Sequence, residues 1–194
     1  MNSSPSIPNP ASDSGVSDAL LGLASLARAL DGRARLADVG ALMWMLLRPV
    51  VPGEAMALFL LDDEHDHVVI RYAAGLHAPS LVGVTRPAAH GLAGWAAMNR
   101  QSLVNADPTL DLGFRAQSTP ALQSCVVTPL IDNDAVVAVL AIYRTAPATF
   151  TGDHARLLEV LGPSLAAALV DAVIAEHENE IVARTFVTPL KLVQ

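Results

Sequence analysis

Basic residues are scarce in this sequence, and lysine is almost absent. The 194 residues include 12 Lys or Arg against 19 Asp or Glu, and Lys191 is the one lysine. The formal net charge of −7 argues against a nucleic-acid surface, because such surfaces neutralise phosphates with clustered basic side chains. The same scarcity excludes a polybasic patch that would hold the chain on an anionic membrane.

Cysteine is nearly absent as well. The single thiol, Cys125, cannot form a disulfide within the chain, which is typical of a protein in a reducing compartment. The first residues are rich in serine and proline and lack the basic and apolar stretches of a secretory signal. We therefore expect a cytoplasmic protein.

Long apolar runs and aromatic side chains are also in short supply. The longest uncharged apolar stretches, 39–47 and 160–170, fall short of the roughly 20 residues that a membrane-spanning helix needs. Aromatic residues make up 4% of the chain, whereas hydrophobic residues make up 52%. We expect no membrane insertion, and a core that Ala, Leu and Val fill.

The N-terminal part of the chain divides into two segments. Residues 1–16 contain three prolines and few apolar residues, which is typical of a disordered lead-in. Residues 17–52 predict two amphipathic helices, over about 17–30 and about 36–47, separated by an Asp-Gly break. Leu20, Leu23, Ala24 and Ala27 form the apolar stripe of the first helix.

Residues 53–172 then form the main domain. Strand-like runs at 55–61 and 68–74 predict one antiparallel hairpin, and runs at 124–131 and 135–143 predict a second. The second hairpin turns at Asp-Asn-Asp, and Asn and Asp tolerate the backbone conformations of tight turns. The stretches between the two hairpins are largely irregular, apart from the segment described next.

Residues 90–108, which we call the lid segment, combine glycines, a short helical stretch, a short strand and an Asp-Pro stop. Gly91 and Gly94 permit close backbone approach or a positive φ. Trp95 and Met98 lie three residues apart, so a helix directs both at one surface. This combination predicts a lid laid over a sheet.

A long helix from about residue 152 closes the domain, and its more polar continuation, 173–194, is interpreted as a connection to another domain. The helix carries a stripe of Leu158, Leu161, Leu165, Leu169 and Ala172. The order of all elements predicts an α+β fold. We expect a single antiparallel sheet, N- and C-terminal helices packed on one face, and a lid of short helices and loops over the other. We also expect a homodimer through the terminal helices.

The ordered motifs resemble the GAF domain, a small-molecule-sensing module of signalling proteins, from about Ala55 to Ala172. The resemblance implies an antiparallel sheet with helices behind it and a lidded pocket in front. It rests on Gly-Leu-Ala-Gly-Trp-Ala at 91–96, Arg-Gln-Ser-Leu-Val-Asn-Ala-Asp-Pro at 100–108, Thr-Pro-Leu at 128–130, the strand 136–142 and Phe-Thr-Gly-Asp at 150–153.

The resemblance implies a non-enzymatic sensing or regulatory domain. An unidentified small molecule, or a partner, would shift the lid and the sheet, and the terminal helices would relay that shift. The receiver would be an output domain such as a histidine kinase, a cyclic-di-GMP enzyme or a transcription factor. Two alternatives stay open: a ligand-free dimerisation scaffold built on the stripes of 36–46 and 158–172, and a small thiol enzyme using Cys125.

The sequence identifies no cofactor. Cyclic-GMP-binding GAF domains carry an Asn-Lys pair, whereas Asn105 precedes Ala106 here. Bilin-carrying members use a pocket cysteine commonly followed by His, whereas Cys125 precedes Val126. Free-methionine-sulfoxide reductases of this fold use at least two thiols, and this chain has one.

Strand alternation provides the first candidate ligand contacts. Ser124, Val126 and Thr128 share one face of their strand. Because that face is the more polar one, we assign it to the pocket. Trp95 of the lid segment is read either as lid core or as a platform for the ligand.

Three further residues are candidates on chemical grounds. Arg71 is the one charge within its strand and is either a surface residue or an anion contact in the pocket. Asp107 precedes a proline and is either a turn-capping residue or an acceptor for a ligand donor. Phe114 follows shortly after and would lie near the pocket.

The sequence gives only weak indications of a metal or haem site. Residues 62–67 are rich in metal-ligand types but lie where a polar hairpin tip belongs, so we assign no metal there. His77 and His90 flank the lid segment and could ligate haem iron, although ordinary loop histidines are the simpler interpretation. Cys125 is interpreted as a small buried hydrophobe.

Overall fold

The computed structural model describes residues 35–62, 64 and 66–186, and the predicted lead-in and helix 17–30 lie outside them. One six-stranded sheet runs through it in the order β3-β2-β1-β6-β5-β4. Its strands are β1 (Ala55–Leu61), β2 (His67–Gly75), β3 (Thr85–Pro87), β4 (Leu103–Ala106), β5 (Ser124–Asp132) and β6 (Ala135–Arg144).

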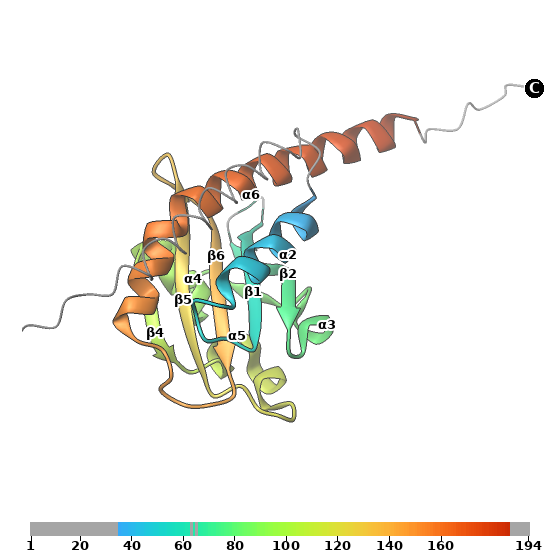
Figure 1. Ribbon diagram of the computed structural model, residues 1–194. Helices are drawn as coiled ribbons and strands as arrows, with labels where there is room; N and C mark the ends of the chain where they lie inside the picture. Colours follow the sequence, from blue (N-terminus) through green and yellow to red (C-terminus); the bar gives the residue numbers. More distant parts are fainter. Residues whose placement is uncertain (1–34, 63, 65, 187–194) are drawn as a thin grey trace, which may run out of the picture.

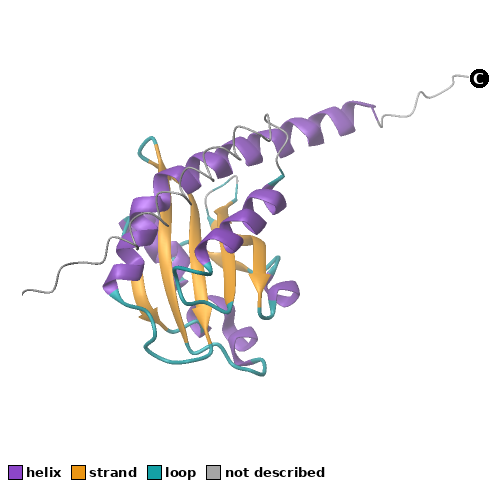
Figure 2. Cartoon of the chain, viewed as in Figure 1, coloured by secondary structure: helices purple, strands orange, loops and turns teal. Residues whose placement is uncertain are grey.

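Helices cover both faces of this sheet (Figure 1). They are α2 (Leu36–Leu47), α3 (Ala78–Leu81), α4 (Gly91–Asn99), α5 (Thr109–Leu112), the 3₁₀ helix η1 (Gly113–Gln117) and α6 (Gly152–Phe186). Helices α2 and α6 cross one face and α4 lies behind the other, as Figure 2 shows. Every strand pair is antiparallel, so the predicted α+β fold is confirmed.

The two predicted hairpins are confirmed, with β1 paired to β2 and β5 paired to β6. The second turn places Asn133 at φ 44° and Asp134 at φ 62°. These left-handed conformations are required at both central residues of the tight hairpin turn that matches strand twist. Asn and Asp adopt them at little cost.

Two stretches expected to be loops contain short elements. Residues 75–89 hold α3 and the edge strand β3, and residues 107–121 hold α5 and η1. Strand β3 has three residues and ends in Pro87, which is tolerated because proline at an edge removes no bond from the sheet interior. Elements of three to five residues carry too short a period to be recognised from sequence.

The face of the sheet beneath α2 and α6 carries one hydrophobic cluster, the helix-side cluster. The predicted stripe of α6 and the α2 residues Leu36, Val39 and Met43 are buried in it together with Leu58, Leu140 and Ile142 of the sheet. Helix α2, which the sequence division separates from the main domain, therefore packs on the same core. Helix α6 runs without interruption past residue 172.

This packing decides which surfaces are left for a dimer. The apolar stripes of 36–46 and 158–172, assigned to a dimer interface from sequence, are largely buried against the sheet of their own chain. A dimer interface on those stripes would have to compete with this packing, because the same side chains already contact the sheet. Among the side chains that the structure describes, the large apolar residues that α2 and α6 leave exposed are Met45, Val160, Val173 and Ile174.

Helix α6 is long and apolar enough, over Gly152–His177, to cross a membrane by length and composition. The sequence analysis counted only uninterrupted apolar stretches. It therefore missed this helix, whose apolar window contains a few charged residues. In the fold, 44% of its most apolar window is buried. Its apolar side chains pack on β5 and β6, so α6 is a core helix of this domain.

The opposite face of the sheet carries a second cluster, the lid-side cluster. Phe59, Ile70, Val127 and Tyr143 project from the sheet into it, and Leu112 of α5 joins them. Helix α4 contributes the short side chains Ala93 and Ala96 and the larger Leu92. The predicted lid is therefore present and packs directly on the sheet.

Close approach of α2 to the sheet depends on Gly40. A Cβ at this position would lie 2.5–2.7 Å from ring carbons of Tyr72 on β2. We predict that Gly40→Ala lowers the free energy of unfolding by about 1–3 kcal/mol through overpacking. Urea unfolding followed by circular dichroism measures this change.

Gly152→Ala is the matched control, because a Cβ there meets no atom within 4 Å. It should leave stability unchanged or raise it by up to about 1 kcal/mol, since alanine favours the helix. In a Tyr72→Ala background the Gly40→Ala penalty should shrink. An equal penalty in both backgrounds contradicts the proposed steric cause.

Candidate ligand site beneath helix α4

Asp111, a residue of α5, is fully buried and binds the first turn of α4. Its carboxylate accepts hydrogen bonds from the N–H of Leu92 at 2.7 Å and of Ala93 at 3.1 Å. The first turn of a helix leaves such donors without internal partners, and its dipole favours a negative charge there. Asp111 therefore caps α4 from another element, whereas the N-cap residue His90 makes no side-chain cap bond.

Two glycines and an arginine hold Asp111 in place. Arg86 of β3 donates from Nε to the Asp111 carbonyl oxygen at 2.7 Å. Gly91 has φ +84°, and a Cβ there would collide with Asp111 Oδ1. Gly113 has φ +59°, and its Cβ would lie 2.7 Å from Arg86 Nη2. Only glycine combines these backbone angles with this proximity.

Burial raises the pKa of Asp111 from 3.8 to about 6. The two backbone N–H groups of α4 and the charge of Arg86 act in the opposite direction, since each stabilises the carboxylate. Burial outweighs them because the group is removed from water. A carboxyl with such a pKa can accept a hydrogen bond near neutral pH and donate one in mildly acidic solution.

Tyr143 and Cys125 lie next to each other on the lid side of the sheet, in β6 and β5. Both side chains are fully buried. The Tyr143 hydroxyl makes no hydrogen bond to any atom of the described residues. Its pKa lies well above 10, mainly through burial and further through the nearby charges of Asp111 and Cys125. These groups therefore share one region under α4.

The Cys125 thiol, unlike the Tyr143 hydroxyl, has a polar partner. Its Sγ lies 3.4 Å from the carbonyl oxygen of Ala106, to which it can donate a weak hydrogen bond. Burial raises the pKa of this thiol strongly, and the charges of Asp111 and Asp107 add to the effect. Because the thiolate is the reactive form, this position disfavours nucleophilic chemistry.

Comparison with known families gives the region its context. A family model described as the GAF domain matches residues 37–170. The chain belongs to the GAF domain family. No curated protein matches the sequence significantly.

Several solved structures share the fold. The GAF domain from Acinetobacter phosphoenolpyruvate-protein phosphotransferase is 18% identical, with a TM-score of 0.65 over 84% of this chain and 97% of that chain. Free methionine-R-sulfoxide reductase from Neisseria meningitidis in complex with its substrate is 19% identical, with a TM-score of 0.65 over 90% and 98%. The GAF-B domain of DevS from Mycobacterium smegmatis is 17% identical, with a TM-score of 0.56 over 74% and 96%. At these identities the likeness shows the fold alone.

Within this GAF domain, the assignment of Ser124, Val126 and Thr128 to the pocket side of the sheet is wrong. Val126 is buried in the helix-side cluster, and its alternation neighbours point the same way. The two hydroxyls are used internally: Ser124 Oγ donates to Ala146 O at 2.7 Å, and Thr128 Oγ1 accepts from Ser102 Oγ at 3.2 Å. The two hydroxyl groups of this strand thus bind neighbouring loops. The alternate residues Cys125 and Val127 face the lid.

Trp95 and Phe114 also lie away from the buried region. Trp95 is 39% exposed and is not among the buried residues of α4, so it is not part of the lid core. Phe114 is 74% exposed, and the Arg115 guanidinium lies 4.9 Å from its ring centroid. Helical spacing groups residues on one side but does not say whether that side faces the core.

Arg71 and Asp107 have structural positions of their own. The register of β2 against β1 shifts between Tyr72 and Ile70, which leaves Arg71 as the extra residue of a β-bulge, exposed to solvent. The Asp107 carboxylate accepts from Thr109 N at 2.9 Å and thereby supports the start of α5. The turn-capping interpretation of Asp107 is confirmed.

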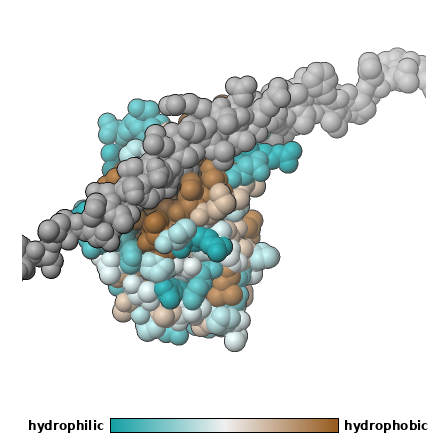
Figure 3. Space-filling view, viewed as in Figure 1, coloured by the Kyte–Doolittle hydropathy of each residue, from teal (hydrophilic) through white to brown (hydrophobic). Residues whose placement is uncertain are grey.

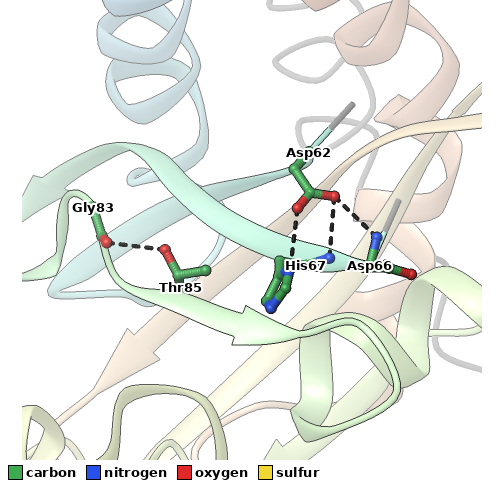
Figure 4. A network of polar contacts seen from close by, with 5 residues as sticks. All are labelled: Asp62, Asp66, His67, Gly83 and Thr85. Atoms are coloured by element: carbon green, nitrogen blue, oxygen red, sulfur yellow. Dashed lines mark hydrogen bonds and ion pairs between the residues drawn. The ribbon is translucent and has the colours of Figure 1, made fainter. Parts of the chain in front are cut away.

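The acidic hairpin tip is arranged around Asp62 (Figure 4). Its carboxylate accepts from the backbone N–H of Asp66 and His67 at 2.9 and 3.1 Å and lies 3.1 Å from His67 Nδ1. These contacts, the His67 N–H first, lower the pKa of Asp62. Asp63 and His65 lie outside the described residues. Among the residues that are described, no three His, Cys, Asp or Glu side chains gather as metal ligands.

Neither histidine considered for haem is buried, since His77 is half-buried and His90 is exposed. His77 Nε2 lies 2.8 Å from the carbonyl oxygen of Pro120 and so holds one loop against another. His90 is exposed at the N-cap of α4.

Sequence reasoning missed Asp111 and Tyr143. Asp111 stands between two leucines, two residues before Gly113, in a stretch expected to be irregular. Tyr143 stands near the end of an otherwise aliphatic strand. Each is a polar group in an apolar setting, which is the one signal the sequence offers. It does not reveal which face of the sheet, or which helix, the group serves.

We predict a pH-dependent stability that Asp111 controls. Because the folded-state pKa is raised, the folded protein binds this proton more readily than the unfolded chain, so the Asp111 contribution to stability falls as the pH rises from about 4 to about 6. The shift from 3.8 to about 6 corresponds to about 3 kcal/mol. Urea unfolding between pH 4 and 7 measures it.

The comparison variant is Asp111→Asn, which keeps the shape and removes the titration. Its free energy of unfolding, minus that of the wild type, should increase across this pH window. Asp107→Asn, at the surface cap of α5, should show no such increase. Parallel pH profiles of wild type and Asp111→Asn would contradict the assignment.

Cys125 should resist alkylation in the native protein. Iodoacetamide at pH 8 should modify it at least about a hundredfold more slowly than in the protein unfolded in urea, because burial removes both access and thiolate. Intact-mass spectrometry over time measures the rate. Rapid modification of the folded protein would restore the thiol-enzyme alternative.

Proposed function

We propose that this GAF domain is a non-enzymatic regulatory domain that binds a small molecule between the sheet and helix α4. The observation that carries the proposal is the buried Tyr143 hydroxyl, which lacks a partner among the described residues and lies near the buried Asp111 carboxyl. An unpaired buried hydroxyl destabilises a protein by about 1–3 kcal/mol. A ligand atom that pairs with it would remove that cost.

The surroundings suggest the chemistry of the ligand. Most of the lid-side cluster is apolar, with Phe59, Ile70 and Leu112 among its members. A compact molecule with an apolar body and one polar end fits such surroundings, the polar end accepting from Tyr143 and donating to Asp111. Contact with Asp111 would make affinity depend on pH around 6, where this carboxyl titrates.

A route for relay starts at the same residue. Asp111 caps α4 through Leu92 and Ala93, so a ligand that competes for its carboxylate alters how firmly α4 is held. Strand β5 contacts α4 on one face and α6 on the other. A ligand shifts such a system only by binding one arrangement more tightly than another. We propose that α6 carries the shift to an output domain, with a histidine kinase, a cyclic-di-GMP enzyme or a transcription factor as candidates.

The absence of catalysis is part of the proposal. Support comes from Cys125, whose thiol is buried and has a raised pKa. Further support comes from the dispersed positions of His67, His77 and His90, of which the first and last are exposed and His77 is half-buried. A ligand-free dimerisation scaffold is the second candidate, and the exposed Met45, Val160 and Ile174 favour it. In either case we expect a cytoplasmic homodimer.

The test uses freshly purified wild type and Tyr143→Phe, with Tyr72→Phe as the control on the other face of the sheet. Native mass spectrometry should detect a bound small molecule on the wild type and on Tyr72→Phe, and at least about tenfold less on Tyr143→Phe, because the variant lacks the hydroxyl that pairs with the ligand.

The unliganded proteins give the second readout. Without ligand, Tyr143→Phe should be as stable as the wild type or more stable by about 1–3 kcal/mol, since no unpaired hydroxyl remains. A wild type that carries no small molecule from any growth condition, together with a stabilised Tyr143→Phe, would support the scaffold instead.

A further inference from the structure

A small pocket with a mixed polar lining lies where α6 passes the open edge of β5. It differs from the groove where β1 and β6 meet α6, whose lining is almost entirely apolar, like much of the face that α2 and α6 cover (Figure 3). The volume of the polar pocket is about 160 Å³. Sites for drug-sized ligands and cofactors have volumes of about 300–1,000 Å³, so this pocket suits a much smaller metabolite.

The pocket exists because a strand pair and a side chain are both missing there. Pairing of β4 with β5 begins at Leu103 opposite Val127, so Pro129, two residues further along β5, has no β4 residue beside it. On the α6 side stands Gly162. A Cβ at Gly162 would have Pro129 O, at 3.9 Å, as its one close neighbour among the described residues. The space beside this glycine is therefore unfilled by the fold.

One part of the pocket is rich in hydrogen-bond acceptors. Pro163 lies inside α6 and lacks an N–H, so the carbonyl of Glu159, four residues earlier, receives no helical hydrogen bond from it. The Glu159 carboxylate belongs to the same lining. Ser102 Oγ donates its proton to Thr128 Oγ1 at 3.2 Å, which leaves the lone pairs of Ser102 as acceptors. An ammonium group, with three donors and a positive charge, complements such oxygens.

The pocket also carries a positive charge. Arg100, the C-cap residue of α4, lines it and donates from Nη2 to Asp134 O at 2.6 Å. A guanidinium has five N–H donors, so others remain for a carboxylate. Arg100 and Glu159 do not neutralise each other, because the ion pairs within the described part of the chain are His67–Asp62 and Arg144–Glu54. Two opposite charges that share one small pocket match a molecule that carries both.

We propose that this pocket binds a small free amino acid as its zwitterion. The ammonium group lies at Glu159 and Ser102, the carboxylate lies at Arg100, and the short side chain lies against Ile131 of the lining. The volume limits the ligand to an amino acid of the size of glycine, alanine or serine. Because Arg100 ends α4 and Glu159 belongs to α6, the bound amino acid connects the lid helix to α6. This site is separate from the region beneath α4 and does not involve Tyr143.

Isothermal titration calorimetry of the full chain with L-alanine tests the proposal. L-alanine should bind one to one with a Kd below about 1 mM. L-lactate has a hydroxyl in place of the ammonium group, and L-alaninamide has a neutral amide in place of the carboxylate. Each should bind at least about tenfold more weakly, because each loses one charge-assisted contact.

Variants locate the binding. Glu159→Gln and Arg100→Gln should each weaken L-alanine binding at least about tenfold. The matched controls Glu64→Gln and Arg156→Gln remove exposed charges that do not line the pocket, and they should bind like the wild type. Gly162→Ala should weaken binding several-fold by filling the space, while its urea midpoint stays equal or rises, since alanine favours a helix.

Three outcomes overturn the proposal. The first is that glycine, L-alanine and L-serine all fail to bind at concentrations up to about 10 mM. The second is that L-alanine binds no better than L-lactate and L-alaninamide, because the pocket would then not recognise a zwitterion. The third is that Tyr143→Phe abolishes L-alanine binding whereas Glu159→Gln retains it, which would place the amino acid beneath α4. Circular dichroism confirms that each variant is folded.

Discussion

Burial of the central strands on both faces is the constraint on which the rest of this structure depends. Strands β5 and β6 are buried almost continuously, over residues 124–130 and 138–143. One set of side chains packs with α2 and α6, and the alternate set packs with α4 and α5. A sheet of this kind is stable only when both faces are covered. The lid is therefore an integral part of the fold, and any ligand beneath it must share space with a packed core.

The lid is held by hydrogen bonds to a carboxylate more than by burial of large apolar side chains. Helix α4 buries mainly the short side chains Ala93 and Ala96, which contribute little apolar area. Its first turn is instead bonded to Asp111, whose backbone is in turn bonded to Arg86. The buried carboxylate destabilises the folded state near neutral pH, as its raised pKa indicates. A contact that is specific and costly at once supports the proposal that a ligand alters how α4 is held.

The two faces of the sheet differ in what they leave unpaired or exposed. Beneath α4, Tyr143 and Asp111 place buried polar groups in apolar surroundings. On the other face, an apolar groove where β1 and β6 meet α6 leaves Ile174 exposed. Strand β5 contacts α4 on one face of the sheet and α6 on the other. At 18% and 19% identity, the solved GAF-fold structures show the fold alone, so the proposed ligand rests on these residues.

The sequence by itself determined the long elements, because periods of two and 3.6 persist over enough residues to be read. The bounds of α2 and β1, the hairpin turn at Asn133 and the buried stripe of α6 all follow from such patterns. Tertiary structure alone decided the candidate site. Alternation groups Ser124 with Thr128 but is symmetric with respect to the two faces of the sheet, so it cannot say which face meets the lid. The cap that Asp111 forms joins residues about 20 apart in the chain. Only the folded backbone brings the carboxylate of α5 within hydrogen-bonding distance of the two N–H groups of α4.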